Sequence, residues 1–308
     1  MATQHTFQSF VVYTISSPDG HSRASFVPEK GGVGSSLIMP WQNQERELLY
    51  QHDHFWQRGN PNLPGGWPFI FPICARIERD GIFGNYLYDG ELYNLPIHGF
   101  ASAMPWQVKS DDQNQPDKIT LTLSATPETL KCYPFRFHIE LEYSMENNKF
   151  ICKQTYTNND TKPMPYYGGF HPYFLTPPAQ QGKEKVMLDY KPLRRFRYNE
   201  RLTDLIGTQE LFPLPASITN PIINEQLVEL KENKTITLSY PDGFKITMQA
   251  DGVEDVNLFP YVQLYTQAQE PFICIEPWMG FPNALNTIAG SRWLRPGQSE
   301  HGVLQLSV

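Results

Sequence analysis

Cysteine is scarce in this sequence. Its four cysteines, Cys74, Cys132, Cys152 and Cys274, are spread over 308 residues and form no C-x-x-C pair. A disulfide framework needs a dense set of cysteines, and a thiolate metal site needs closely spaced pairs. The cysteine pattern therefore indicates neither of these.

An excess of positive charge is also missing. The 25 Lys and Arg residues against 32 Asp and Glu residues give a formal net charge of −7. Proteins that bind nucleic acid or anionic lipid draw much of their affinity from basic residues that displace counterions from phosphates. We therefore expect neither a nucleic-acid partner nor binding to a membrane surface.

Long apolar runs are absent as well. No run approaches the roughly 20 apolar residues that a membrane-spanning helix needs. Residues 1–9 are polar and contain no basic segment followed by an apolar one, so the sequence indicates no secretory signal. Together with the lack of a disulfide pattern, this favours a location in the cytoplasm.

Helical periodicity is nearly absent too. The best helix candidate is 126–131, where Thr126 can cap the first turn and Pro127 suits the first helical position, but this run holds only about a turn and a half. The chain contains 27 prolines, whereas average usage of about 5% predicts roughly 15. Proline at this density interrupts helices repeatedly.

Alternation of apolar and polar residues is the dominant pattern instead. It runs through 117–126 and again through 135–145 and 150–158, which flank a polar reversal. A second hairpin is predicted around Pro241, Asp242 and Gly243. Further strands are predicted at 261–266, at 272–278 and at the C-terminus, in the run HGVLQLSV.

Because strands follow strands without intervening helices, the sequence predicts an all-β fold, with large antiparallel sheets packed face to face as a β-sandwich. No linker or repeat divides the chain, so we expect one domain over residues 1–308. Two long stretches, 52–98 and 172–224, follow no sustained period. Long ordered loops in compact domains are usually functional, so we expect the site there.

Two of the eight histidines, His98 and His171, lie among aromatic residues and glycines. Aromatic walls beside a glycine backbone suit a cleft for a flat, hydroxyl-rich ring. The alternative for each residue is a core histidine bonded to a carbonyl. By contrast, His138 is expected to be an exposed cross-strand partner, and we interpret His52 and His54 as a surface pair without a third metal ligand.

Glu276 follows an apolar strand and precedes Pro277 and Trp278. A glutamate in this setting is rarely solvated, and burial raises the pKa of its carboxyl group. It is therefore half of a buried ion pair or a general base. Arg76, after the apolar run 69–75, is the cation expected to serve such a partner or a sugar oxygen; its alternative is a structural ion pair.

An ordered set of motifs runs along nearly the whole chain. The motifs are Pro28-x-x-Gly31-Gly32, Gly65-Gly66-x-Pro68-x-x-Phe71-Pro72-x-x-x-Arg76-Ile77, His98-Gly99-Phe100-Ala101 followed by Trp106, His171-Pro172-Tyr173-Phe174, Val262-Gln263-Leu264-Tyr265-Thr266, Cys274-x-Glu276-Pro277 and Leu294-x-Pro296-Gly297. In this order and spacing, the set resembles that of the aldose 1-epimerase (galactose mutarotase-like) family.

The resemblance implies a β-sandwich that holds a sugar in a cleft and interconverts its α and β anomers. It implies that Glu276 is the general base for the anomeric hydroxyl and that His171 is the general acid for the ring oxygen. Arg76 and His98 would hold the sugar, with Trp278 as a further binding residue. Such a reaction uses neither cofactor nor metal, and we expect a monomer or a weak homodimer.

The sequence departs from the family at one position. The family often has a sugar-binding Asp between the catalytic His and the Val-Gln-Leu-Tyr strand, whereas this chain reads NPIINEQL at 220–227. Asn224 is expected to take that place, or Asp204 from the preceding loop. An amide donates as well as accepts hydrogen bonds, so the preferred sugar can differ.

Several other functions are compatible with parts of the sequence. The arginines 194, 195, 197 and 201 could bind a sugar phosphate, although a solvated loop is favoured. The protein could be a carbohydrate-binding protein without turnover, but binding alone needs no matched acid and base. A His₂Glu zinc site of His98, His171 and Glu276 lacks the expected spacing. A glycoside hydrolase needs two carboxylates, and one convincing candidate is present.

Overall fold

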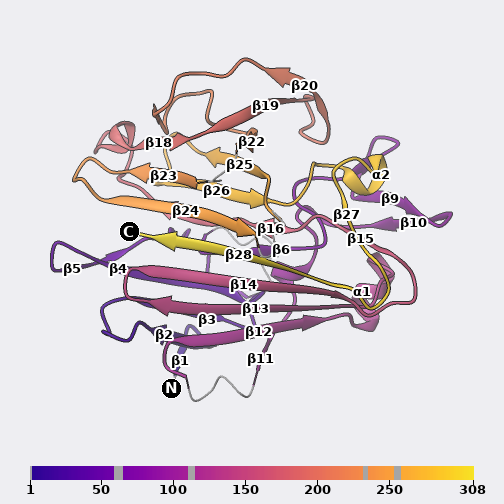
Figure 1. The fold of residues 1–308 in the computed structure, drawn as a ribbon, viewed down its shortest axis with the longest axis horizontal. Helices are drawn as coiled ribbons and strands as arrows, with labels where there is room; N and C mark the ends of the chain where they lie inside the picture. Colours follow the sequence, from indigo (N-terminus) through magenta and orange to yellow (C-terminus); the bar gives the residue numbers. More distant parts are fainter. Residues whose placement is uncertain (1, 59–64, 110–114, 232–234, 253–257) are drawn as a thin grey trace.

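The computed structural model describes residues 2–58, 65–109, 115–231, 235–252 and 258–308. Three large sheets dominate it, and their described strand pairs are antiparallel (Figure 1). The predicted all-β sandwich with few, short helices is confirmed. None of the helices in the described ranges has the length and apolar character needed to cross a bilayer.

The first sheet is formed by the N-terminal five strands in chain order. These are β1 (Thr3–Phe7), β2 (Phe10–Ser16), β3 (Arg23–Val27), β4 (Val33–Trp41) and β5 (Gln44–Glu47). Phe26 on β3 packs against Tyr143 of the second sheet, with ring centroids 4.4 Å apart. The two sheets therefore meet face to face.

The second sheet has nine strands and contains the C-terminal strand β28 between β14 and β24 (Figure 1). In spatial order they are β11 (Gln107–Val108), β12 (Lys118–Ser124), β13 (Phe137–Glu146), β14 (Lys149–Asn158), β28 (Ser299–Ser307), β24 (Lys245–Gly252), β23 (Thr235–Ser239), β18 (Met187–Tyr190) and β21 (Ala216–Ser217). Both predicted hairpins are confirmed here: Glu146 pairs with Lys149, and Ser239 pairs with Lys245. Gly243 has the positive φ, 86°, that the second turn requires.

The third sheet has eight strands and carries the pocket described below. They are β20 (Leu205–Gln209), β19 (Pro192–Tyr198), β22 (Gln226–Leu230), β25 (Tyr261–Thr266), β26 (Phe272–Trp278), β16 (Gly169–Phe170) and β6 (Phe69–Ile70), with β17 (Tyr173–Leu175) also paired to β26. Phe69 of β6 lies 6.2 Å, centroid to centroid, from Tyr156 of the nine-stranded sheet. The third sheet thus packs on the second through aromatic rings.

Short elements fill the remaining connections. They are β7 (Glu78–Arg79) with β8 (Ile82–Phe83), β9 (Asn85–Tyr88) with β10 (Glu91–Asn94), β15 (Met164–Tyr166) with β27 (Arg292–Leu294), helices α1 (Pro127–Cys132) and α2 (Ala284–Thr287), and 3₁₀ turns at Ala101–Ala103 and Lys183–Lys185. Helix α1 is the helix that the sequence predicts, and Thr126 caps it by accepting a bond from the Thr129 N–H.

One hydrophobic core runs from Ile15 in β2 to Leu306 in β28. It follows from the alternation seen in the sequence, because inward residues of β13 and β14 are buried and their neighbours are not. Each large apolar side chain removed from water contributes about 1.5–3 kcal/mol to folding. Strand β26 is different, because all seven of its residues are buried. Any polar side chain on β26 therefore lies inside the protein.

Candidate active site

Glu276 is the buried carboxyl group of strand β26. Successive side chains of a strand point to opposite faces, so Cys274, Glu276 and Trp278 share one face, which is turned away from Ile273 and Ile275. Glu276 is 2% exposed. The Trp278 Nε1–H donates to Glu276 Oε2 at 3.2 Å. The strand therefore fixes both the depth and the direction of the carboxyl group.

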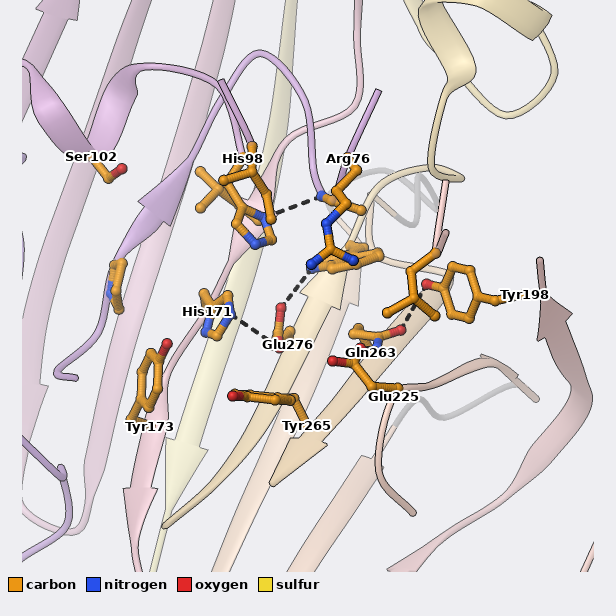
Figure 2. Close-up of a pocket in the computed structure, with 16 residues that line it drawn as sticks. Arg76, His98, Ser102, His171, Tyr173, Tyr198, Glu225, Gln263, Tyr265 and Glu276 are labelled. Atoms are coloured by element: carbon orange, nitrogen blue, oxygen red, sulfur yellow. Dashed lines mark hydrogen bonds and ion pairs between the residues drawn. The ribbon is translucent and has the colours of Figure 1, made fainter. Parts of the chain in front are cut away.

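His171 lies between β16 and β17 and meets Glu276. Its backbone N–H donates to the Pro68 carbonyl at 2.9 Å, just before β6. Its ring stacks on Tyr173, with centroids 4.8 Å apart and planes 17° apart. His171 Nε2 lies 3.3 Å from Glu276 Oε1 (Figure 2). Two side chains that are remote in sequence thus form one acid–base pair.

Burial controls the charge of this pair. It raises the pKa of Glu276 well above the usual range of a carboxyl group, and the nearby Glu225 carboxylate raises it further. Burial lowers the pKa of His171 to about 4. Both shifts favour the uncharged forms of the two groups. Transfer of a proton from the carboxyl to the imidazole gives the charged form of the pair without any change in proton count.

His98 lies beside this pair. Its Nδ1 accepts a hydrogen bond from the Ala75 N–H at 3.1 Å, which assigns the ring proton to Nε2. Its ring meets that of His171 edge to face at 5.1 Å. Burial, together with His171 and Arg76, lowers the pKa of His98 well below its usual range. His98 is therefore a neutral N–H donor.

Arg76 supplies positive charge to the pocket. It follows Ala75, which has a left-handed φ of 61°. Its half-buried side chain points toward the pocket centre (Figure 2). Within the part of the chain that the structure describes, the guanidinium group makes no hydrogen bond or ion pair. The alternative prediction, a structural ion pair for Arg76, is therefore not seen, and its five N–H donors face the pocket.

A second polar wall comes from residues to which the sequence analysis assigned no role. Gln263 on β25 is the cross-strand neighbour of Glu276. Its Oε1 accepts from the Tyr198 hydroxyl at 2.9 Å, and its Nε2 donates to Glu225 Oε2 at 3.3 Å. Burial raises the pKa of Glu225. A buried amide in the apolar run 261–266 could have indicated Gln263; Glu225, alone after a loop, gave no comparable signal.

Together these groups line a cavity of about 300 Å³. This volume is at the lower end for ligand pockets and suits a small molecule. Polar groups from Arg76, His98, His171, Glu225 and Glu276 converge on it (Figure 2). The remaining lining residues are Pro68, Ile70, Ala75, Ile97, Ser102, Tyr173, Tyr198, Leu202, Gln263, Tyr265 and Trp278. Both irregular stretches contribute, although residues 59–64 of the first lie outside the described residues.

Asn224 and Asp204 do not line this cavity. Asn224 Oδ1 accepts from the Thr266 N–H at 3.0 Å, and the next residue, Glu225, enters the pocket instead. Asp204 accepts from Asn283 Nδ2 at 2.9 Å. The structure thus places the Glu225 carboxyl group in the cavity lining, and neither of the two predicted residues.

The four arginines considered for a phosphate also lie outside the lining. Arg194 pairs with Glu229 at 2.5 Å, and Arg201 pairs with Glu78 at 2.6 Å. Arg195 is buried, and its Nη2 donates to Gln226 Oε1 at 2.7 Å. Arg197 is exposed. The favoured interpretation is a solvated loop; three of the four arginines instead lie on strand β19, and Arg195 is buried there.

The structure brings together three side chains that could hold a metal ion, and they are not the three considered from the sequence. Donor atoms of His171, Cys274 and Glu276 all lie within 4.8 Å of one another, and His98 is not part of this group. A metal ligand must be deprotonated to bind. Burial raises the pKa of both the Cys274 thiol and the Glu276 carboxyl, so protons compete with a metal at two of the three ligands.

Comparisons with known proteins agree with the fold and with the family that the motifs resemble. A family model for aldose 1-epimerase matches residues 12–307. The chromosomal LacX protein of Lactococcus lactis is 24% identical over 245 residues, which cover 76% of this chain and 80% of LacX.

Solved structures align over essentially the full length. The Slr1438 protein of Synechocystis sp. PCC 6803 aligns with a TM-score of 0.81 at 25% identity, covering 99% of this chain and 98% of that one. A galactose 1-epimerase from Lactobacillus acidophilus NCFM aligns with a TM-score of 0.71 at 13% identity, covering 100% and 98% of the two chains. At 13% identity, the similarity to the galactose 1-epimerase shows a shared fold alone.

Proposed function

This chain belongs to the aldose 1-epimerase family, and on that basis we propose that it interconverts the α and β anomers of a hexose, with Glu276 as the base and His171 as the acid. The observation that carries the proposal is the contact of 3.3 Å between His171 Nε2 and Glu276 Oε1 inside the pocket. A binding protein without turnover gains nothing from such a matched pair.

The reaction moves two protons. Glu276 removes the proton from the anomeric O1 while His171 donates a proton to the ring oxygen O5, the C1–O5 bond breaks and C1 becomes an aldehyde. After rotation about the C1–C2 bond, the reverse transfers close the ring on the other face. Each positioned acid or base contributes about 10²- to 10⁴-fold.

The close contact of the two groups suits this chemistry. O1 and O5 are bonded to the same carbon, so an acid and a base that serve both must lie close together. Glycoside hydrolases instead separate two carboxyl groups by about 5–9.5 Å. Ring opening begins from the charged form of the pair and ends with a protonated Glu276 and a neutral His171. It thus leaves the pair in the form that burial favours.

The pocket charge favours an unphosphorylated hexose. Among the described residues, Arg76 is the one Lys or Arg that lines the cavity, while Glu225 and Glu276 are two carboxyl groups. A phosphate dianion in this setting lacks the several cationic donors that such groups normally receive. The proposed substrate is therefore a neutral sugar, bound through its hydroxyl groups.

A substrate panel tests this proposal. We expect the protein to accelerate the mutarotation of freshly dissolved glucose or galactose, measured by polarimetry, with kcat/KM at least about tenfold higher than for the corresponding 6-phosphates. A preference for the phosphates would contradict the charge argument. If the protein bound a sugar of the panel but accelerated the mutarotation of none, it would be a carbohydrate-binding protein of the same fold and not an enzyme.

Glu225 is expected to tune the pH dependence. Its carboxylate raises the pKa of Glu276, so Glu225→Gln should lower that pKa. Because Glu276 must be deprotonated to act as the base, the acidic limb of the kcat/KM profile should move to lower pH. A profile recorded from pH 4 to 9 measures the shift. Glu229→Gln is the matched control, since Glu229 on β22 pairs with Arg194 outside the pocket; an equal shift in this control would contradict the role of Glu225.

The proposal includes the setting in which the chain works. We propose one domain, supported by the continuous hydrophobic core from Ile15 to Leu306. A cytoplasmic location is supported by the four cysteines, all of which are free thiols. Proton transfer by the pair uses side chains alone, so the mechanism as proposed requires no cofactor.

A further inference from the structure

Two walls of the pocket are formed by segments that are not neighbours in any sheet. One is the 75–78 segment, which carries Arg76. The other is the 198–204 loop between β19 and β20, which contributes Tyr198 and Leu202 to the lining. A substrate that contacts both walls requires a fixed distance between them.

Asn283 holds the Arg76 segment from outside the pocket. Its backbone N–H donates to the Arg76 carbonyl at 3.3 Å, and its Oδ1 accepts from the Glu78 N–H at 3.0 Å. The two bonds flank Ile77 and hold the backbone immediately after Arg76. Because the guanidinium group has no bond to another described residue, its position depends on this backbone.

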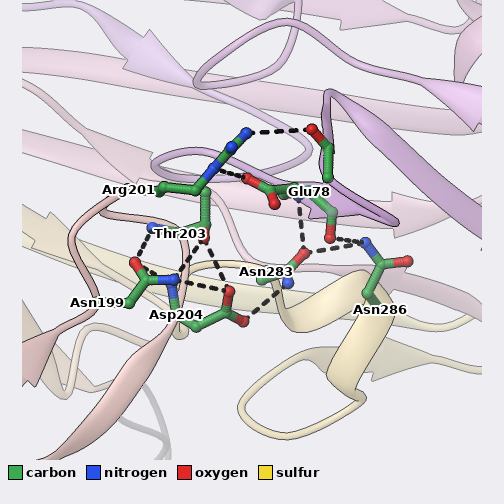
Figure 3. A network of polar contacts seen from close by, with 8 residues as sticks. Glu78, Asn199, Arg201, Thr203, Asp204, Asn283 and Asn286 are labelled. Carbon is green, nitrogen blue, oxygen red and sulfur yellow. Dashed lines mark hydrogen bonds and ion pairs between the residues drawn. The ribbon is translucent and has the colours of Figure 1, made fainter.

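The same side chain reaches the second wall. Asn283 Nδ2 donates to Asp204 Oδ1 at 2.9 Å (Figure 3). The other oxygen of Asp204 accepts from the Thr203 hydroxyl at 2.8 Å, and Asn199 Oδ1 accepts from the Thr203 N–H at 3.0 Å. The 198–204 loop is therefore closed on itself, and it presents one carboxylate oxygen to Asn283.

Asn283 is built into this position. It is 6% exposed, and it has a left-handed φ of 61°, a conformation that Asn tolerates better than most residues. Asn286 Nδ2 donates to its Oδ1 at 2.9 Å. A second link between the same segments is the ion pair of Arg201 with Glu78, in which the arginine side chain is 47% exposed. Exposed ion pairs contribute little, so the buried amide is the stronger link.

We propose that Asn283 is a positioning residue of the sugar pocket, which fixes the distance between Arg76 and the Tyr198–Leu202 wall by bonding to both segments at once. It touches neither the sugar nor the acid–base pair. Its role rests on the proposed function, because Arg76 and the second wall act on a bound sugar. Loss of the link should therefore weaken substrate binding more than proton transfer.

An exchange of the two side chains tests this link. Asn283→Asp sets one carboxylate against the Asp204 carboxylate, and we expect KM to rise about tenfold, as for the loss of a buried hydrogen bond, with kcat changed less than about threefold. Asp204→Asn alone keeps an oxygen available to Asn283, so KM should stay within about twofold. In the double variant, the new amide at 204 donates to the new carboxylate at 283, and KM should return to the Asp204→Asn value.

Three controls make the outcome decisive. Arg201→Gln removes the exposed ion pair and should leave KM within about twofold of wild type; a rise as large as that of Asn283→Asp would overturn the assignment to Asn283. Arg76→Ala gives the KM expected when the sugar contact is lost altogether. Hydrogen exchange of the Glu78 amide, which bonds to Asn283 Oδ1, reports the link without sugar.

The outcomes separate this proposal from the proposed function. Failure of the double variant to restore KM, or unchanged KM in Asn283→Asp, overturns the positioning role in an active enzyme. If wild type shows no turnover, the function fails; the link is then judged by exchange protection of the 76–84 and 198–204 segments. Protection lost in Asn283→Asp and restored in the double variant supports the link, and equal protection in all variants overturns it.

Discussion

Replacement of Glu276 by Gln is expected to reduce the rate of anomer interconversion by about 10³-fold or more, because the amide keeps the shape of the side chain but cannot accept the O1 proton. Polarimetry on freshly dissolved α-glucose measures the loss. The Trp278 Nε1–H can still donate to the remaining oxygen of residue 276, so the side chain should keep its place. Sugar binding should therefore persist in the variant.

The stability of this variant separates chemistry from folding. The folded-state pKa of Glu276 is raised, whereas the unfolded value is about 4.3. As pH rises above the unfolded value, the unfolded chain loses the proton before the folded one, so wild type loses stability and the Gln variant does not. Near pH 8 the variant should melt at least as high as wild type. Activity within a few-fold of wild type would defeat the base assignment.

The second large effect is expected for His171→Asn, which should lower kcat by about 10²- to 10⁴-fold, because no group then donates the proton to O5. Asn is shorter than His and also leaves the stack on Tyr173, so a modest increase in KM should accompany the loss. His138→Asn is the matched control, since His138 lies half-buried on β13, bonded to Ser124 and Glu140. It should retain full activity.

A different outcome would change the assignment of the acid. If His171→Asn kept kcat and the neighbouring His98→Asn lost it, the proton donor to O5 would be His98, whose Nε2 carries the ring proton. The two rings meet at 5.1 Å, so both are close enough to compete for this role. Single-turnover rates for the two variants decide between them.

The strands were predictable because burial leaves a period of two in the sequence. Strands β25 and β26 begin and end at the predicted residues, 261–266 and 272–278, and helix α1 begins at Pro127 as expected. The pairing of β14 with β28 could not be predicted, because alternation shows which face is buried and not which strand lies beside it. The expectation that residues remote in sequence meet in one pocket came from the resemblance to the family.

The site was partly predictable for the same reason. Glu276, His171 and His98 were each unusual for their apolar surroundings, and Arg76 followed an apolar run; the structure brings all four to one pocket. Glu225 was missed because a single carboxylate after a loop has no distinctive local pattern. Asn283 acts through hydrogen bonds to two segments remote in sequence, which no spacing rule reports.

The most direct test of the central claim follows the α anomer signal of fresh glucose by NMR at several protein concentrations. The account predicts a first-order decay toward the anomeric equilibrium whose rate rises linearly with wild-type protein and stays at the spontaneous rate with Glu276→Gln. A decay independent of wild-type concentration, at sugar concentrations that saturate binding, would contradict an acid–base pair at work in this pocket.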